Sequence, residues 1–131
     1  MLDRARQRTS LRILIADDND MIRRGVAGLL SSEPNWEICG EARNGAEALL
    51  KVPELLPDLI LLDVSMPGIN GLEVAHLLRQ DVPHLKILVM SQHDPIHLLP
   101  RVVAAGADGC VDKSHLSRDL VASIRRIVAA E

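Results

Sequence analysis

The sequence predicts an α/β protein: a single (βα)5 domain built on a doubly wound parallel sheet. Short apolar runs, typical of buried strands, alternate along the whole length with segments whose apolar residues recur at helical spacing. Five such strand–helix units in series indicate a parallel sheet covered by helices on both faces, with right-handed crossovers. No internal repeat and no linker-like segment interrupts this order.

The strands are expected where apolar runs are bounded by turn residues. In chain order they comprise residues 11–16, 36–42, 59–62, 85–90 and 109–111. The third run consists only of Leu and Ile, the pattern of a parallel strand buried on both faces.

A helix is expected after each strand. The first carries an apolar face of Ile22, Val26, Leu29 and Leu30, and the last one of Leu120, Ile124, Ile127 and Val128. The residues that can cap helix starts are Asn19 or Asp20, then Asn44, Asn70 and Ser117. Pro100 falls where the fourth helix should start. Because proline lacks an N–H donor and clashes inside a helix, we expect that helix to begin at Leu99 or Pro100, with 95–98 in a loop.

Composition excludes several classes of protein. The 131 residues are 47% apolar and 25% charged, as in an ordinary globular domain, and the net charge of −3 argues against a surface that binds nucleic acid. No apolar segment reaches the roughly 18 residues that a membrane span needs, and the start lacks a secretory signal, so we expect a cytoplasmic protein.

We interpret residues 1–10 as a flexible leader and 11–131 as the folded domain. Cys39 and Cys110 are too few for a disulfide framework and are expected to be small buried residues.

Polar residues follow four of the expected strands: Asp17 and Asp18 the first, Asp63 the third, Ser91 the fourth and Lys113 the fifth. Parallel strands direct their carboxyl ends to the same edge of a sheet, where ligands bind. Clustered carboxylates repel one another, and a hard cation such as Mg²⁺ relieves that repulsion. Each of these residues alone would be an ordinary turn residue. Their joint occurrence predicts a crevice for Mg²⁺ and phosphoryl chemistry, with a carboxylate as the nucleophile.

The chain resembles the receiver domain of two-component response regulators, over about residues 11–130. The resemblance rests on the segments IADDND at 15–20, NGAEAL at 44–49, PDLILLDVSMPGING at 57–71 and AGADGCVDK at 105–113. The first and last segments are most similar to the NarL/FixJ (LuxR-type) subgroup. Members of that subgroup usually continue into a DNA-binding output domain, and we expect no such domain within these residues.

The resemblance implies a flavodoxin-like strand order, 2-1-3-4-5, and a phosphoryl group accepted by Asp63. It implies that Asp18, Asp63 and the backbone carbonyl of Ser65 bind Mg²⁺, with Asp17 acting largely through a water molecule. It also implies that Ser91 and Lys113 contact phosphoryl oxygens. At the switch position, three residues before the lysine, the family usually has Tyr or Phe. Here that residue is Cys110, so the usual coupling between site and surface is in question.

The leading hypothesis is therefore a phosphoacceptor that acts in transcription control and catalyses only its own phosphorylation and dephosphorylation. The alternative is a pseudo-receiver, an interaction module that works without phosphorylation. A metal-dependent phosphohydrolase fits poorly, because the acids after the first strand are adjacent rather than two residues apart. The expected partner is a sensor histidine kinase or a phosphotransfer protein, which the start of the first helix could meet through Met21, Ile22, Arg23 and Arg24. Arg118, Arg125 and Arg126 on the last helix could support a homodimer, or form an ordinary solvated face.

Overall fold

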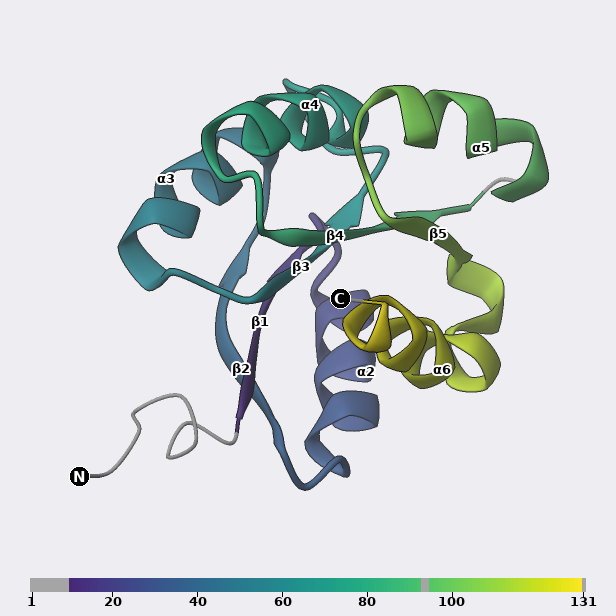
Figure 1. Ribbon diagram of the computed structural model, residues 1–131. Coiled ribbons are helices and arrows are strands. Elements are labelled where there is room, and N and C mark those ends of the chain that lie inside the picture. Colours follow the sequence, from purple (N-terminus) through teal and green to yellow (C-terminus); the bar gives the residue numbers. More distant parts are fainter. Residues whose placement is uncertain (1–9, 93–94, 131) are drawn as a thin grey trace.

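A computed structural model of the protein describes residues 10–92 and 95–130. Its centre is a five-stranded parallel sheet in the order β2-β1-β3-β4-β5, which confirms the predicted topology (Figure 1). The strands are β1 (Leu11–Ala16), β2 (Trp36–Ala42), β3 (Leu59–Asp63), β4 (Lys86–Ser91) and β5 (Gly109–Asp112). Each predicted strand is found, with its ends within one residue of those expected. The predicted leader lies almost entirely outside the described residues.

Helices cover both faces of the sheet (Figure 1). One face carries α3 (Gly45–Leu55), α4 (Gly71–Asp81) and α5 (Pro95–Ala104), and the other carries α2 (Asp20–Ser31) and α6 (Leu116–Ala129). A 3-10 turn, η1 (Lys113–His115), joins β5 to α6. None of the described helices has both the length and the apolar character that crossing a bilayer requires.

The two layers have separate cores because successive strand residues point to opposite faces. Ile60 and Leu62 of β3 belong to the core under α3, α4 and α5, whereas Leu59 and Leu61 belong to the core under α2 and α6. All five residues of β3 are buried. Asp63 is therefore attached to the most enclosed strand of the molecule.

Asparagine side chains cap the N-termini of three of the helices, as predicted. Asn19 accepts hydrogen bonds from the backbone N–H groups of the first turn of α2, Asn44 does so for α3, and Asn70 for α4. The predicted cap at Ser117 is wrong. The 3-10 turn runs directly into α6, which begins at Leu116, and Asp112 caps that turn by accepting from the Ser114 N–H at 2.8 Å.

The predicted start of the fourth helix is also wrong. This helix, α5, begins at Pro95 and contains Pro100 in its interior. Leu98 and Val102 are buried in the core under α3, α4 and α5, while Pro100 is exposed. The burial of these two side chains outweighs the one backbone donor that proline removes, since hydrophobic packing supplies most helix stability in proteins.

Candidate functional site

Three acidic side chains meet at the carboxyl edge of the sheet. Asp17 follows β1, Asp63 ends β3, and Asp18 lies beside Asp17 at the surface. One carboxylate oxygen from each lies within 4.8 Å of the others. Asp17 and Asp63 are buried, at 0% and 2% exposure, whereas Asp18 is exposed. The predicted convergence of these carboxylates is thus present, and the cluster opens to solvent on the side of Asp18.

Lys113 reaches into this cluster from the end of β5. Its ammonium nitrogen lies 2.8 Å from Asp17 Oδ2 and 3.3 Å from Asp63 Oδ2, and its side chain is 7% exposed. Burial lowers the pKa of the ammonium group, but the two carboxylates outweigh that effect and leave the pKa above its usual value. Lys113 therefore carries its full charge between the buried acids at neutral pH.

Asp63 has the most perturbed carboxyl group of the site. Its pKa is raised from 3.8 to about 6, first by burial and then by the neighbouring charge of Asp17. Lys113 and the backbone N–H of Ser65, which donates to Asp63 Oδ1 at 3.1 Å, oppose this rise. The carboxylate is thus poorly solvated but still mostly ionised at neutral pH, a state that favours nucleophilic attack.

The oxygen atoms of the cluster fit a hard divalent cation. Among the described residues, Asp17 Oδ2 and Asp63 Oδ2 are buried oxygens that accept no hydrogen bond of regular geometry. Lys113 balances their charge as an ion-pair partner but leaves them lone pairs for coordination. A carboxylate cluster that opens to water beside Asp18 suits Mg²⁺, which binds through one or two carboxylates and keeps several waters.

The loop after β3 is folded tightly against Asp63. The N–H of Gly71 donates to the carbonyl of Val64 at 2.8 Å, and a Cβ atom on Gly71 would lie 2.0 Å from the carbonyl oxygen of Asp63. Gly68 turns the loop with a φ of +80°, a conformation that favours glycine. The sequence analysis did not single out Gly71. The sequence signal that could have identified Gly71 is its position directly after the helix-capping Asn70.

Ser91 and Cys110 lie on the two strands beyond β3. Ser91 is the last residue of β4 and is 1% exposed, and the adjacent Met90 is the register partner of Asp63. Cys110 pairs with Val89 in the middle of β5 and is half-buried against the core under α3, α4 and α5. Burial raises the pKa of its thiol, so the thiol is neutral at physiological pH.

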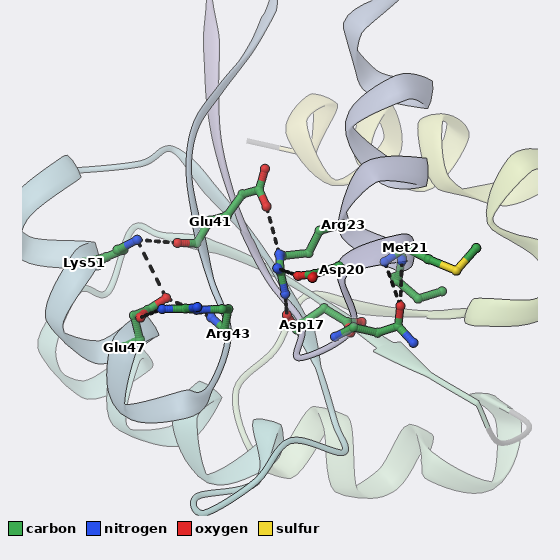
Figure 2. Close-up of polar contacts among 10 residues, drawn as sticks. Asp17, Asp20, Met21, Arg23, Glu41, Arg43, Glu47 and Lys51 are labelled. Carbon is green, nitrogen blue, oxygen red and sulfur yellow. Dashed lines mark hydrogen bonds and ion pairs between the residues drawn. The ribbon is translucent and has the colours of Figure 1, made fainter.

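Arg23 has an unexpected position. The sequence analysis grouped it with residues that could meet a partner, but it is only 7% exposed and its guanidinium group lies beside Asp17 and Asp20 (Figure 2). Its guanidinium group donates to the Asp17 carbonyl at 2.6 Å and to Glu41 Oε1 at 2.8 Å, and it also pairs with Asp20. Met21, by contrast, is 78% exposed. Glu41 is brought to Arg23 only by the fold, so no sequence signal pointed to that contact, whereas Asp20 lies three residues away on the same helix.

Comparisons with known proteins agree with this geometry. Residues 13–125 match the response regulator receiver domain family. The transcriptional activator protein ExaE of Pseudomonas putida is 39% identical over 89% of this chain and 55% of its own length. The response regulator GacA of Pseudomonas protegens is 34% identical over 92% of this chain and 57% of its length. The chain thus spans little more than half the length of these relatives.

Solved structures of response regulators also match this chain. A two-component response regulator of the LuxR family from Aurantimonas sp. SI85-9A1 superimposes with a TM-score of 0.87 at 30% identity, covering 93% of this chain and 87% of that one. The signal receiver domain of the putative response regulator NarL from Mycobacterium tuberculosis gives 0.85 at 30% identity, covering 93% and 98%.

Proposed function

This chain belongs to the response regulator receiver domain family, and on that premise we propose that Asp63 accepts a phosphoryl group from a sensor histidine kinase or a phosphotransfer protein. The observation that carries the proposal is the environment of Asp63. Its buried carboxylate lies beside two further acids and 3.3 Å from the ammonium nitrogen of Lys113. A site with a nucleophile, a cation-binding group and a fixed positive charge has the parts that phosphoryl transfer requires.

In the proposed reaction, a carboxylate oxygen of Asp63 attacks the phosphorus atom of the donor. In a phosphohistidine donor the phosphorus–nitrogen bond breaks, and the imidazole nitrogen keeps the electron pair. The product is an acyl phosphate on Asp63, which water later converts to the free carboxylate and dihydrogen phosphate. Lys113 neutralises one phosphoryl oxygen and the hydroxyl of Ser91 donates a hydrogen bond to another. We propose that these two reactions are the only ones that the domain catalyses.

We propose that Mg²⁺ is held by Asp17, Asp18, Asp63 and the backbone carbonyl of Ser65. Receiver domains bind Mg²⁺ in general, and the buried lone pairs of Asp17 and Asp63 support the same ion here. When bound, the ion supplies positive charge that offsets the repulsion between the carboxylates and the incoming phosphoryl group. A phosphoryl group adds roughly −1.5 to −2 charges, which we expect to shift an equilibrium between inactive and active conformations.

The output that we propose is control of transcription through a DNA-binding domain outside these residues. Support comes from the relatives: ExaE is a transcriptional activator, and the Aurantimonas protein is a LuxR-family regulator. We also propose a cytoplasmic location, where a sensor kinase presents its phosphohistidine. No finding favours the phosphorylation-independent module over this function.

Binding of beryllofluoride, a phosphoryl mimic, tests the proposal. Amide NMR spectra of the chain are recorded with Mg²⁺ and beryllofluoride added together and separately. We expect saturable shifts of amides around Asp63 that need both additions and vanish in Asp63→Ala. The same response should persist in Asp81→Ala, a control at an exposed acid. Amides that do not respond would contradict the phosphoacceptor function. Trp36 fluorescence is a poor substitute, because Trp36 lies on the edge strand β2.

A further inference from the structure

Arg23 is a buried, charged side chain next to the site. The proposed phosphoryl transfer does not use it. It lies in the first turn of α2, and its guanidinium group contacts three acceptors from different segments (Figure 2). One is the Asp17 carbonyl, at 2.6 Å from Nη1; the others are the carboxylates of Glu41 and Asp20. The side chains of Glu41 and Asp20 are 46% and 70% exposed, so water can solvate them without Arg23. The bond to the Asp17 carbonyl, by contrast, is buried.

These contacts fix the orientation of Asp17. Its backbone N–H donates to the Ala42 carbonyl at 3.0 Å, its carbonyl accepts from Arg23, and its Oδ1 accepts from the Asn19 N–H at 2.9 Å. With these groups engaged, Oδ2 is the atom that faces Lys113 at 2.8 Å. The carbonyl of Asp17 belongs to the peptide that leads to Asp18. The bond from Arg23 therefore fixes the peptide from which the side chains of Asp17 and Asp18 both extend.

Arg23 is itself held from β2. Glu41 Oε1 accepts from its Nε at 2.8 Å, and the Glu41 carbonyl accepts from Lys51 Nζ of α3 at 2.5 Å. The planar guanidinium fork presents five N–H donors in fixed directions and can serve three acceptors at once. A lysine ammonium is a compact charge on a flexible stem and cannot reproduce this arrangement.

We propose that Arg23 is a positioning residue that holds the Asp17–Asp18 peptide in the conformation that binds Mg²⁺. The inference rests on the proposed function, because it assigns Arg23 a role at the same metal site. Groups that orient metal ligands without touching the metal contribute about 10- to 100-fold to metal affinity. The loss of Arg23 should therefore weaken Mg²⁺ binding without removing any ligand.

The test is a Mg²⁺ titration of the chain followed by the amide shifts of Asp17, Asp18 and Asn19. Arg23→Met should raise the dissociation constant about tenfold, and Arg23→Lys should raise it nearly as much although it keeps the charge. Arg24→Met is the matched control: Arg24 is the next residue of α2, is exposed, and should leave the constant within about twofold.

Two further measurements separate positioning from a merely structural role. A structural role would lower the urea midpoint and leave the dissociation constant of the folded protein unchanged. With acetyl phosphate as donor, saturating Mg²⁺ should restore the phosphorylation rate of Arg23→Met, since the reacting groups are intact. Should Arg23→Met not fold, Arg23→Lys decides the question.

The outcomes distinguish the two proposals. A folded Arg23 variant with the affinity of the wild type overturns the role of Arg23 and leaves the phosphoacceptor function standing. A wild-type chain that shows no saturable Mg²⁺ binding overturns the proposed function, and this inference with it.

Discussion

Replacing Asp63 by asparagine should stabilise the protein, by an amount that depends on pH. The native carboxyl has a pKa of about 6, compared with an ordinary value of 3.8 that we take for the unfolded chain. The native state thus binds this proton more tightly, and the wild type loses stability as the pH rises between about 4 and 6. Asparagine cannot ionise, so the variant avoids this loss.

The magnitude follows from the two pKa values. A tenfold difference in proton affinity corresponds to about 1.4 kcal/mol, so the difference between 3.8 and about 6 gives about 3 kcal/mol above pH 7. The gain should fall to about 0.5 kcal/mol at pH 4, and it should disappear well below pH 3.8, where the carboxyl is protonated in both states. The asparagine oxygen can still accept the hydrogen bond from the Ser65 N–H, so the substitution creates no new unsatisfied donor.

Urea unfolding in EDTA, followed by circular dichroism at about pH 4 and about pH 7.5, measures this difference. Asp81→Asn, at an exposed carboxylate, should change the free energy of unfolding by less than about 0.5 kcal/mol at both pH values. The argument is that the buried, ionised carboxylate destabilises the folded protein. It would be refuted if Asp63→Asn had the same effect at both pH values, or if it destabilised the protein at the higher one.

Four further substitutions, one of them a control, test other parts of the structure. Lys113→Met should abolish the response to beryllofluoride yet tighten Mg²⁺ binding in an NMR titration. The ammonium group lies within 3.3 Å of two carboxylates and therefore competes with the cation. Weaker Mg²⁺ binding in the variant would contradict this reasoning. Gly71→Ala should lose about 2–3 kcal/mol in urea unfolding, since its Cβ would meet the Asp63 carbonyl at 2.0 Å. Gly28→Ala, with no atom within 4 Å of the new Cβ, should instead gain about 0.5–1 kcal/mol, and equal effects of the two would refute the close-approach argument. Pro100→Ala should raise the free energy of unfolding by about 1–3 kcal/mol by restoring a backbone donor inside α5, and a loss would show that proline's rigidity matters more.

The sheet and the meeting of the acidic residues could be predicted because both depend on local patterns. The continuous apolar run that forms β3 indicates a buried parallel strand, and an asparagine before a segment with helical apolar spacing indicates where a helix starts. Parallel strands then direct Asp17, Asp63 and Lys113 to one edge without any knowledge of distances.

The parts that could not be predicted depend on packing between distant segments. Pro100 is unfavourable in a helix by local rules, but Leu98 and Val102 bury enough apolar surface against the sheet to keep α5 intact. Arg23 at the start of a helix has the pattern of a solvated residue, and its ion pair with Glu41 spans 18 positions of the sequence. Such contacts exist only once the chain has folded.

The most direct test of the central claim is mass spectrometry of the chain after incubation with acetyl phosphate. The account predicts one phosphoryl group, mapped to Asp63 by peptide analysis, that forms with Mg²⁺, fails to form in EDTA, and is absent from Asp63→Asn. A phosphoryl group on another residue, or one that forms equally well without Mg²⁺, would contradict the claim that the clustered carboxylates bind a cation and present Asp63 as the nucleophile.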